Sequence, residues 1–271
     1  MAIHWSYGNV KLSDMSMHYA RSGGDKPVLV LAHGFSDHGM CWLPVAQELA
    51  PEYDVILPDA RGHGLSSPVK PGELVNRAED LAAFISALGL EKPIVGGHSM
   101  GGITASVVGA HHPDLAGALI LEDPAWIDRR AEDPPFARQD NPWLKELQGY
   151  ASQPLDEIIA KCHQDNPLWS EIELSPWAES KKQLDLKVFQ VRDQLMELDW
   201  RTIVQHIVVP ALLITGDVER GWIISPENAQ NVREMNPLIQ VAHIEGVGHN
   251  IRRENYPAYM AAVKNFLSAV R

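Results

Sequence analysis

The chain has 271 residues, 45% of them hydrophobic, which is enough for one domain with a sizeable buried core. Its 23 basic and 35 acidic residues give a net charge of −12 with no basic cluster, which argues against nucleic acid or an anionic membrane as a partner. No stretch approaches the length of a membrane span and the first residues lack a signal-peptide pattern, so a cytoplasmic protein is expected. The two cysteines, Cys41 and Cys162, have no metal-type spacing and indicate no disulfide framework, and neither a metal nor another cofactor is expected.

The first 120 residues alternate between strand and helix patterns. Two strands are expected within residues 3–20, around a turn at Tyr7-Gly8-Asn9. Further along, strands are expected at 27–32, at 53–57, directly after Pro93 and at 118–121, and helices at 42–49, 76–88 and 102–111. Strands that alternate with helices imply a mostly parallel sheet with right-handed crossovers.

The alternation stops after Asp123. From Pro124 to about His206 the sequence is rich in proline and tryptophan, and it favours helices, for example at 155–163 and 177–198, with no convincing strand. Strands and helices alternate again from 208–215, through a strand at 241–244, to a helix at 257–270. Five tryptophans fall in or near the helical part, and we expect most of them to form its own small core and one or two to face a pocket: Trp126, Trp143, Trp169, Trp177 and Trp200.

The run Gly97-His98-Ser99-Met100-Gly101 follows an apolar strand and precedes a helical segment. This G-x-S-x-G pattern is typical of a nucleophile elbow, a strand-to-helix turn so sharp that only glycine fits beside the serine. The turn would expose the Ser99 hydroxyl at the positive end of a helix, where developing negative charge is stabilised.

Three more segments occur in the order that such a site needs. A buried strand ends in His33-Gly34-Phe35, a glycine-rich loop spans residues 59–66, and a late strand is followed by Gly246-Val247-Gly248-His249. With the elbow, these motifs make nearly the whole chain resemble the α/β-hydrolase superfamily, in particular its capped, esterase-like serine hydrolases. The resemblance implies a central, mostly parallel sheet flanked by helices, with a helical cap inserted after the sixth strand. The core would be residues 1–124 and 207–271, and the cap residues 125–206.

The resemblance also implies a catalytic triad in the chain order serine, acid, histidine. His249 matches the position of the general base that would activate Ser99. We interpret the other histidines of the motifs, His33, His63 and His98, as structural residues. Arg61, in the glycine-rich loop, is likewise interpreted as structural and not as a phosphate ligand.

The acid of the triad stays open between three residues. In the family it usually follows the strand after the cap, about three residues beyond a glycine, where this chain has Glu219; Asp217 lies two positions earlier. Glu122 is a further alternative, because some relatives carry the acid after the strand that precedes the cap. Any of these carboxylates could orient the imidazole if it reaches His249.

An oxyanion hole needs two main-chain N–H groups directed at the tetrahedral intermediate. The candidates are Met100, the residue after the nucleophile, and Phe35, in the loop after His33-Gly34. Phe35 could also form an apolar wall of the pocket.

We therefore predict a serine hydrolase that cleaves a small or medium carboxylic ester, as carboxylesterases do, through an acyl-enzyme on Ser99. Lactonase, amidase and carbon–carbon bond hydrolase chemistry would use the same triad, and a non-catalytic protein that binds a small ligand is the alternative of another class. Haloalkane dehalogenase or epoxide hydrolase activity is not expected, because a serine nucleophile would form an ether that water does not cleave readily. The expected partner is a small ester-type molecule, and the oligomeric state stays open.

Overall fold

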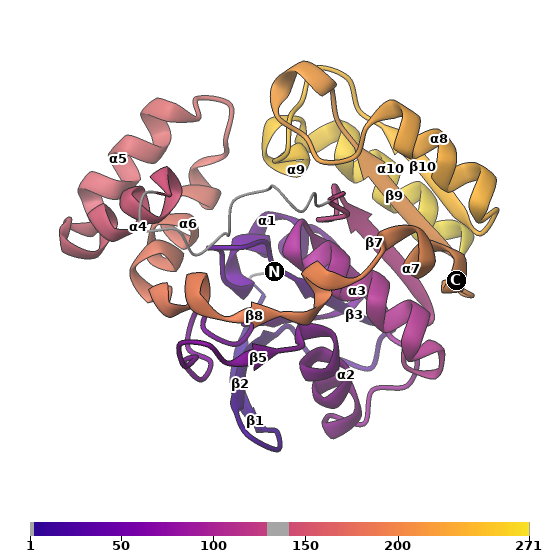
Figure 1. The fold of residues 1–271 in the computed structure, drawn as a ribbon, viewed down its shortest axis with the longest axis horizontal. Helices are drawn as coiled ribbons and strands as arrows, with labels where there is room; N and C mark the ends of the chain where they lie inside the picture. The colour runs from indigo at the N-terminus through magenta and orange to yellow at the C-terminus, as the bar shows by residue number, and fades with distance from the viewer. Residues whose placement is uncertain (1–2, 129–140, 271) are drawn as a thin grey trace.

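A computed structural model describes residues 3–128 and 141–270 of the chain (Figure 1). In this part of the chain, eight strands form one sheet in the order β1-β2-β4-β3-β6-β7-β9-β10. β1 pairs antiparallel with β2, and β2 pairs antiparallel with β4. The six strands from β4 to β10 in this order are parallel to one another. The strands are β1 (Ser6–Lys11), β2 (Ser16–Arg21), β3 (Val28–Ala32), β4 (Asp54–Pro58), β6 (Ile94–His98), β7 (Ala118–Glu122), β9 (Ala211–Thr215) and β10 (Ile239–His243).

Helices cover both faces of the sheet, and each face has its own apolar core. One core joins alternate strand residues to the helices α1 (Leu43–Leu49), α9 (Ile251–Glu254) and α10 (Tyr256–Ala269). The other joins the opposite strand residues to α2 (Arg77–Ala87), α3 (Met100–His111), α7 (Trp200–His206) and α8 (Pro226–Met235). Because β3, β4, β6, β7 and β9 are buried on both sides, they consist almost entirely of apolar residues and glycine.

Three helices between β7 and β9 lie together at one side of the sheet and form what we call the helical lobe: α4 (Pro142–Ser152), α5 (Leu155–Asp165) and α6 (Glu171–Gln183) (Figure 1). The lobe has a separate small core that includes Leu147, Tyr150, Ile158 and Ala178. By contrast, α7 packs against α3, where the rings of Trp200 and Trp126 stack with centroids 5.7 Å apart. The last helix of the expected insertion therefore belongs to the core of the sheet.

Two local predictions are wrong. Tyr7-Gly8-Asn9 lies within β1, where it pairs antiparallel with residues 18–20 of β2. The turn is at residues 12–15, where the N–H of Leu12 donates to the carbonyl of Met15. The helix expected over 177–198 ends at Gln183. Asp185 caps a short 3₁₀ helix there, η3 (Leu186–Gln190).

The segment after η3 contains a strand that the sequence did not predict. A two-residue strand, β8 (Arg192–Asp193), pairs with β5 (Leu74–Val75), and a second 3₁₀ helix, η4 (Gln194–Glu197), follows it. Helical periodicity alone could not reveal this break, because the pairing partner lies over 100 residues away in the sequence.

Candidate active site

Ser99 lies in a strained turn between β6 and α3. Its backbone angles are φ 53° and ψ −112°, a conformation that non-glycine residues rarely adopt and that often marks a functional site. A Cβ on Gly97 would collide with the carbonyl of Gly101, and a Cβ on Gly101 would collide with the carbonyl of Ala32 on β3. The two glycines of the motif are therefore required by the close approach of α3 to the strands.

His249 and Asp123 form a short hydrogen bond. His249 follows β10 in the loop before α9, and its Nδ1 lies 2.6 Å from Oδ2 of Asp123, which directly follows β7. The Asp123 side chain is fully buried, whereas 28% of the His249 side chain is exposed. An ionised Asp123 accepts the Nδ1–H of His249, which leaves Nε2 of the imidazole as a proton acceptor.

The Asp123 carboxylate is held by two main-chain donors as well. The N–H groups of Ile223 and Ile224, in the loop after β9, donate to Asp123 at 2.9 and 3.0 Å. Asp123 itself has a positive φ of 37°, which is uncommon for a residue other than glycine. The loop after β9, where the acid was expected, thus supplies N–H donors to the carboxylate of Asp123, the residue that follows β7.

The three expected acids lie elsewhere. Asp217 accepts hydrogen bonds from His243 and from the N–H of Gly246, and so stabilises the turn after β10. Glu219 lies exposed on a short 3₁₀ helix, η5 (Val218–Arg220). Glu122 is fully buried, and its carboxylate accepts two hydrogen bonds from Arg252: one from the main-chain N–H and one from Nη1. Asp123, which sequence reasoning did not select, is the carboxylate that reaches His249.

Strand register explains why Asp123 and not Glu122 lies at the site. In the parallel pair of β6 and β7, His98 is opposite Glu122, so Ser99 and Asp123 follow at the next position of the register. Successive side chains of a strand point to opposite faces, and a shift of one residue reverses the face. Ala118 and Ile120 join one core and Leu119 and Leu121 the other, so Glu122 and Asp123 take opposite faces. Because residues 118–121 are all apolar, the sequence alone does not indicate which face is which.

His98 braces the loop that carries His249. Its Nε2–H donates to the carbonyl of His249 at 2.9 Å, and the two rings lie 4.5 Å apart between centroids. Burial lowers the pKa of His98 well below its usual value, and the neighbouring His249 lowers it further, so His98 stays neutral. His33 braces a second loop: its Nε2 accepts from the N–H of Ala60, and its Nδ1–H donates to the carbonyl of Gly34.

Arg61 serves the fold of its own loop. Its guanidinium pairs with three carboxylates, those of Asp14, Glu73 and Asp80, and so has its charge balanced within the protein. These contacts account for the arginine of the glycine-rich loop without a phosphate ligand.

The loop that contains Phe35 makes a tight turn beside the elbow. The N–H of Asp37 donates to the carbonyl of Gly34 at 3.1 Å, and Ser36 has a φ of 65°. A Cβ on Gly34 would come within 2.7 Å of Nδ1 of His98. Met100 is the first residue of α3, so its N–H belongs to the positive end of that helix.

Ser99 and His249 line the same pocket, of about 260 Å³, between the ends of the strands and the helical lobe. Five aromatic side chains also line it: Phe35, Trp143, Tyr150, Trp169 and Trp177. Three of the five tryptophans in or near the helical part therefore face the pocket, more than expected, whereas Trp126 and Trp200 lie in the core beside α3. The rest of the lining is mostly polar or charged and includes Asp37, Glu146, Asn166 and Arg253, so the pocket has an aromatic side and a polar side. A concave site with aromatic walls and polar groups is suited to a small molecule.

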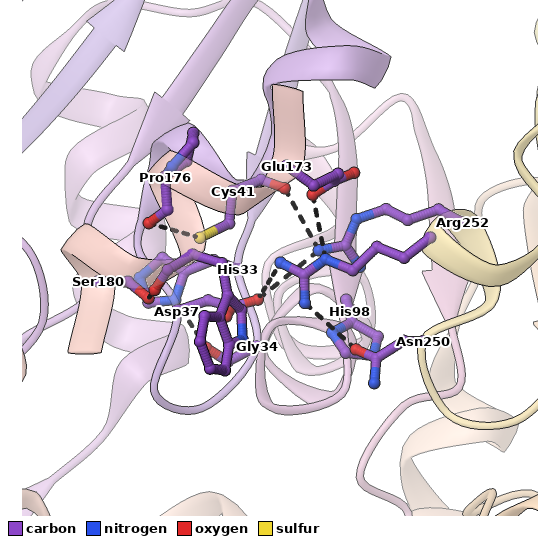
Figure 2. Close-up of polar contacts among 12 residues, drawn as sticks. His33, Gly34, Asp37, Cys41, His98, Glu173, Pro176, Ser180, Asn250 and Arg252 are labelled. Carbon is purple, nitrogen blue, oxygen red and sulfur yellow. Dashed lines mark hydrogen bonds and ion pairs between the residues drawn. The ribbon is translucent and has the colours of Figure 1, made fainter. Parts of the chain in front are cut away.

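A buried group of charged side chains lies at the polar side of the pocket. Asp37 pairs with Lys181 from α6 and with Arg253 from α9, and Arg253 also pairs with Glu173 from α6. Figure 2 shows Asp37 and Glu173 of this group beside Arg252. Burial alone would raise the pKa of Asp37, but Arg253, Lys181 and Arg252 together hold it well below its usual value. Asp37 is therefore a permanent anion that joins the Phe35 loop to two helices.

Comparison with known proteins shows the family. A model of the alpha/beta hydrolase family matches residues 29–263, and the chain belongs to this family. The chain is 31% identical over 268 residues, 96% of each protein, to N-formylmaleamate deformylase of Pseudomonas putida. It is 28% identical over 256 residues, 89% of this chain and 88% of the relative, to 2-succinyl-6-hydroxy-2,4-cyclohexadiene-1-carboxylate synthase of Yersinia pestis.

Solved structures share the same fold. The structure of E-2-(acetamidomethylene)succinate hydrolase has a TM-score of 0.77 at 20% identity, over 98% of this chain and all of that one. The enol-lactonase of Burkholderia xenovorans has a TM-score of 0.72 at 19% identity, over 96% of this chain and all of that one. Several relatives and structural neighbours are named as hydrolases, which supports an enzyme. Among residues 3–128 and 141–270, no helix has both the length and the apolar character needed to cross a membrane.

Proposed function

We propose that the chain is a serine hydrolase that cleaves the acyl bond of a small carboxylic ester through an acyl-enzyme on Ser99. The observation that carries the proposal is the 2.6 Å hydrogen bond between His249 and the fully buried Asp123, at the pocket that Ser99 also lines. A nucleophile, a base and a group that orients the base are the three parts that this chemistry needs.

In the first step His249 Nε2 takes the proton of the Ser99 hydroxyl while Oγ attacks the carbonyl carbon of the substrate. The bond between that carbon and the leaving oxygen breaks, and the imidazolium returns the proton to the departing alcohol. In the second step His249 takes a proton from water, and the water oxygen attacks the acyl carbon. The bond between that carbon and Oγ then breaks, the carboxylic acid leaves, and the imidazolium returns the proton to Oγ. Asp123 stabilises the imidazolium in both steps and keeps Nε2 directed at the reacting atoms.

The oxyanion of each tetrahedral intermediate would be bound by the main-chain N–H groups of Phe35 and Met100. Met100 supplies a donor at the start of a twelve-residue helix, where the helix dipole also favours negative charge. The turn at residues 34–37 places Phe35 beside the elbow, because Gly34 packs against His98 without a side chain of its own.

We further propose that the helical lobe acts as a cap over the site. Its helices α4 and α6 contribute Trp143, Tyr150, Trp177 and Lys181 to the pocket wall, while Ser99 and His249 come from the sheet side. The cap would comprise α4 to α6, without α7, which packs on α3. Such an arrangement favours small or medium acyl compounds over polymers.

An amide is the second candidate substrate. The relative from Pseudomonas putida that covers 96% of the chain is named as a deformylase of N-formylmaleamate, so it acts on an N-formyl amide. An amide follows the same path as an ester, except that His249 must protonate a leaving nitrogen.

The test is labelling of the protein with a fluorophosphonate probe, together with hydrolysis of p-nitrophenyl acetate and of an N-formyl amide. We expect the wild type to be labelled and to hydrolyse the ester, and Ser99→Ala to do neither while it keeps the circular dichroism spectrum of the wild type. Hydrolysis of the amide but not of the ester would favour an amide as the substrate. A wild type that is neither labelled nor active on either compound would contradict the proposal and favour a ligand-binding protein.

A further inference from the structure

Lys181 of α6 is buried against the loop that carries Phe35. Its side chain is only 3% exposed, and its ammonium group donates to Ser36 O at 2.9 Å, to Ser36 Oγ at 3.0 Å and to Asp37 Oδ1 at 3.1 Å. An ammonium group has three N–H donors, so these three contacts use all of them. Burial lowers the pKa of Lys181, and the facing Asp37 opposes that shift. The geometry makes Lys181 a tie between the loop and α6 and leaves it no donor for a substrate.

Ser36 is the strained residue of this loop. The turn closes from the carbonyl of Gly34 to the N–H of Asp37, and Ser36 is its third residue, with a φ of 65°. The third position of a turn with positive φ is ordinarily occupied by glycine, because a side chain is unfavourable there. The two hydrogen bonds from Lys181 end on this residue, one on its carbonyl and one on its hydroxyl. They compensate the strain and fix the peptide between Ser36 and Asp37, which closes the turn that contains Phe35.

Asp37 extends the tie to the loop of the base. Its Oδ2 accepts from Arg253 at 3.0 Å, and Arg253 also donates to Glu173 and to Oδ1 of Asn250, the residue after His249. Figure 2 shows Asp37, Glu173 and Asn250 together with Arg252 of α9. Cys41 and Pro176 lie alongside, and the thiol of Cys41 donates to the carbonyl of Pro176. The group thus connects α6 to both loops that would carry catalytic atoms.

We propose that Lys181 is a positioning residue, which holds Ser36 in its strained conformation and thereby aims the N–H of Phe35 at the oxyanion. The proposal rests on the function proposed above. It assigns the helical lobe a part in catalysis, because a helix inserted after β7 would shape the oxyanion hole through one buried side chain. A loop without this tie would relax toward negative φ at Ser36, the turn from Gly34 to Asp37 would open, and Phe35 would no longer be held in one position beside the reacting carbonyl.

The test compares Lys181→Met with Lys182→Met. Lys182 is the next residue of α6, but it donates to main-chain carbonyls at the end of α4 and its contacts do not reach the loop. With p-nitrophenyl acetate, we expect Lys181→Met to lower kcat about 10- to 100-fold, because a misplaced oxyanion donor should cost no more than a donor that is removed. KM should change less than about threefold. The affinity for a trifluoromethyl ketone, which mimics the tetrahedral intermediate, should fall by the same factor. Lys182→Met should leave kcat and this affinity near the wild-type values.

A rescue separates positioning from a merely structural role. Glycine adopts a positive φ without strain, so Ser36→Gly in the Lys181→Met background should recover most of the lost kcat and ketone affinity. A purely structural defect would not be repaired by removing a side chain. If Lys181→Met does not fold, Lys181→Gln, which keeps an N–H donor but shortens the reach, takes its place with the same rescue.

Three outcomes are distinct. A kcat that falls with the ketone affinity and returns with Ser36→Gly supports the inference. Wild-type kcat and ketone affinity in a folded Lys181→Met variant, or a loss that Ser36→Gly does not repair, would overturn it while the serine-hydrolase function stands. A wild type that the fluorophosphonate does not label would overturn both.

Discussion

Asp123 combines three features that are rarely found in one carboxylate. It is fully buried, it has a positive φ of 37°, and it accepts hydrogen bonds from a histidine and from two main-chain N–H groups. Strained backbone of this kind persists only where the surrounding structure holds it, and it concentrates at functional sites. Asp217 also accepts from a histidine and from a main-chain N–H, but it lies partly exposed, its φ is negative, and its histidine is His243 and not His249.

Substitution of these two aspartates should therefore change the activity to different extents. We expect Asp123→Asn to lower kcat/KM about 10³- to 10⁴-fold, because the amide favours the wrong tautomer of His249 and no longer stabilises the imidazolium. Asp217→Asn should lower kcat/KM less than about threefold, since its contacts serve the turn after β10. The measurement is ester hydrolysis by both purified variants. The assignment would fail if Asp217→Asn lost the activity and Asp123→Asn kept it.

At the residue scale, the motifs indicated which serine and histidine to examine, and the structure brings Ser99 and His249 to one pocket. The acid could not be selected in the same way, because carboxylates occur at plausible positions at the end of β7 and in the loop after β9. The decision between Glu122 and Asp123 depends on which face each side chain takes after the last residue of β7. Lys181 gave no sequence signal, since it lies 145 residues from Ser36.

At the scale of elements, the start of α3 is the tightest contact of the site. Gly101 lies against the main chain of β3, and a Cβ there would meet the carbonyls of Ala32 and His33, which cannot move as a side chain can. Gly149, in the middle of α4, has only the flexible end of Gln153 nearby, at 3.9 Å. The two helical glycines thus have opposite roles: one is needed for a close approach, and the other only weakens its helix.

Alanine at these two positions should therefore change stability in opposite directions. We expect Gly101→Ala to lower the free energy of unfolding by about 3 kcal/mol, the upper end of the cost of overpacking. Gly149→Ala should raise it by about 0.5–1 kcal/mol, because alanine loses less conformational entropy in a helix. Urea unfolding of both variants measures the difference. Equal stability of Gly101→Ala and the wild type would show that α3 does not approach β3 so closely.

The alternation of elements was predictable because each buried strand is a continuous apolar run and each helix has a 3.6-residue period. The order of strands, the pairing of β5 with β8 and the end of α6 depend on contacts between distant segments. Residues 184–198 illustrate the limit: their composition suits a helix, but Asp185 and Asp193 cap short 3₁₀ turns and the chain pairs with β5 instead.

At the scale of the whole molecule, acid should destabilise the fold through buried histidines. Burial lowers the pKa values of His33, His63 and His98, and it lowers that of His38 to about 4. Between pH 6.5 and about 4 the unfolded chain binds a proton at His38 that the folded chain does not bind, and the lowered pKa values of the other three histidines act in the same direction below pH 6.5. The unfolded state then carries more bound protons, so the free energy of unfolding falls as the pH falls through this window.

His38 allows this to be tested at one position, because its side chain also caps the 3₁₀ helix η1 (Gly39–Trp42) by accepting from the N–H of Met40. Asparagine is a good capping residue and does not titrate, so His38→Asn keeps the cap and removes the proton. A shift from 6.5 to about 4 corresponds to about 2 kcal/mol of stability lost by the wild type between pH 7 and pH 5. We expect urea unfolding at the two pH values to show that His38→Asn loses about 2 kcal/mol less than the wild type. Equal losses in the two proteins would mean that His38 takes up its proton in the folded state, and the acid sensitivity would then have to come from the other buried histidines.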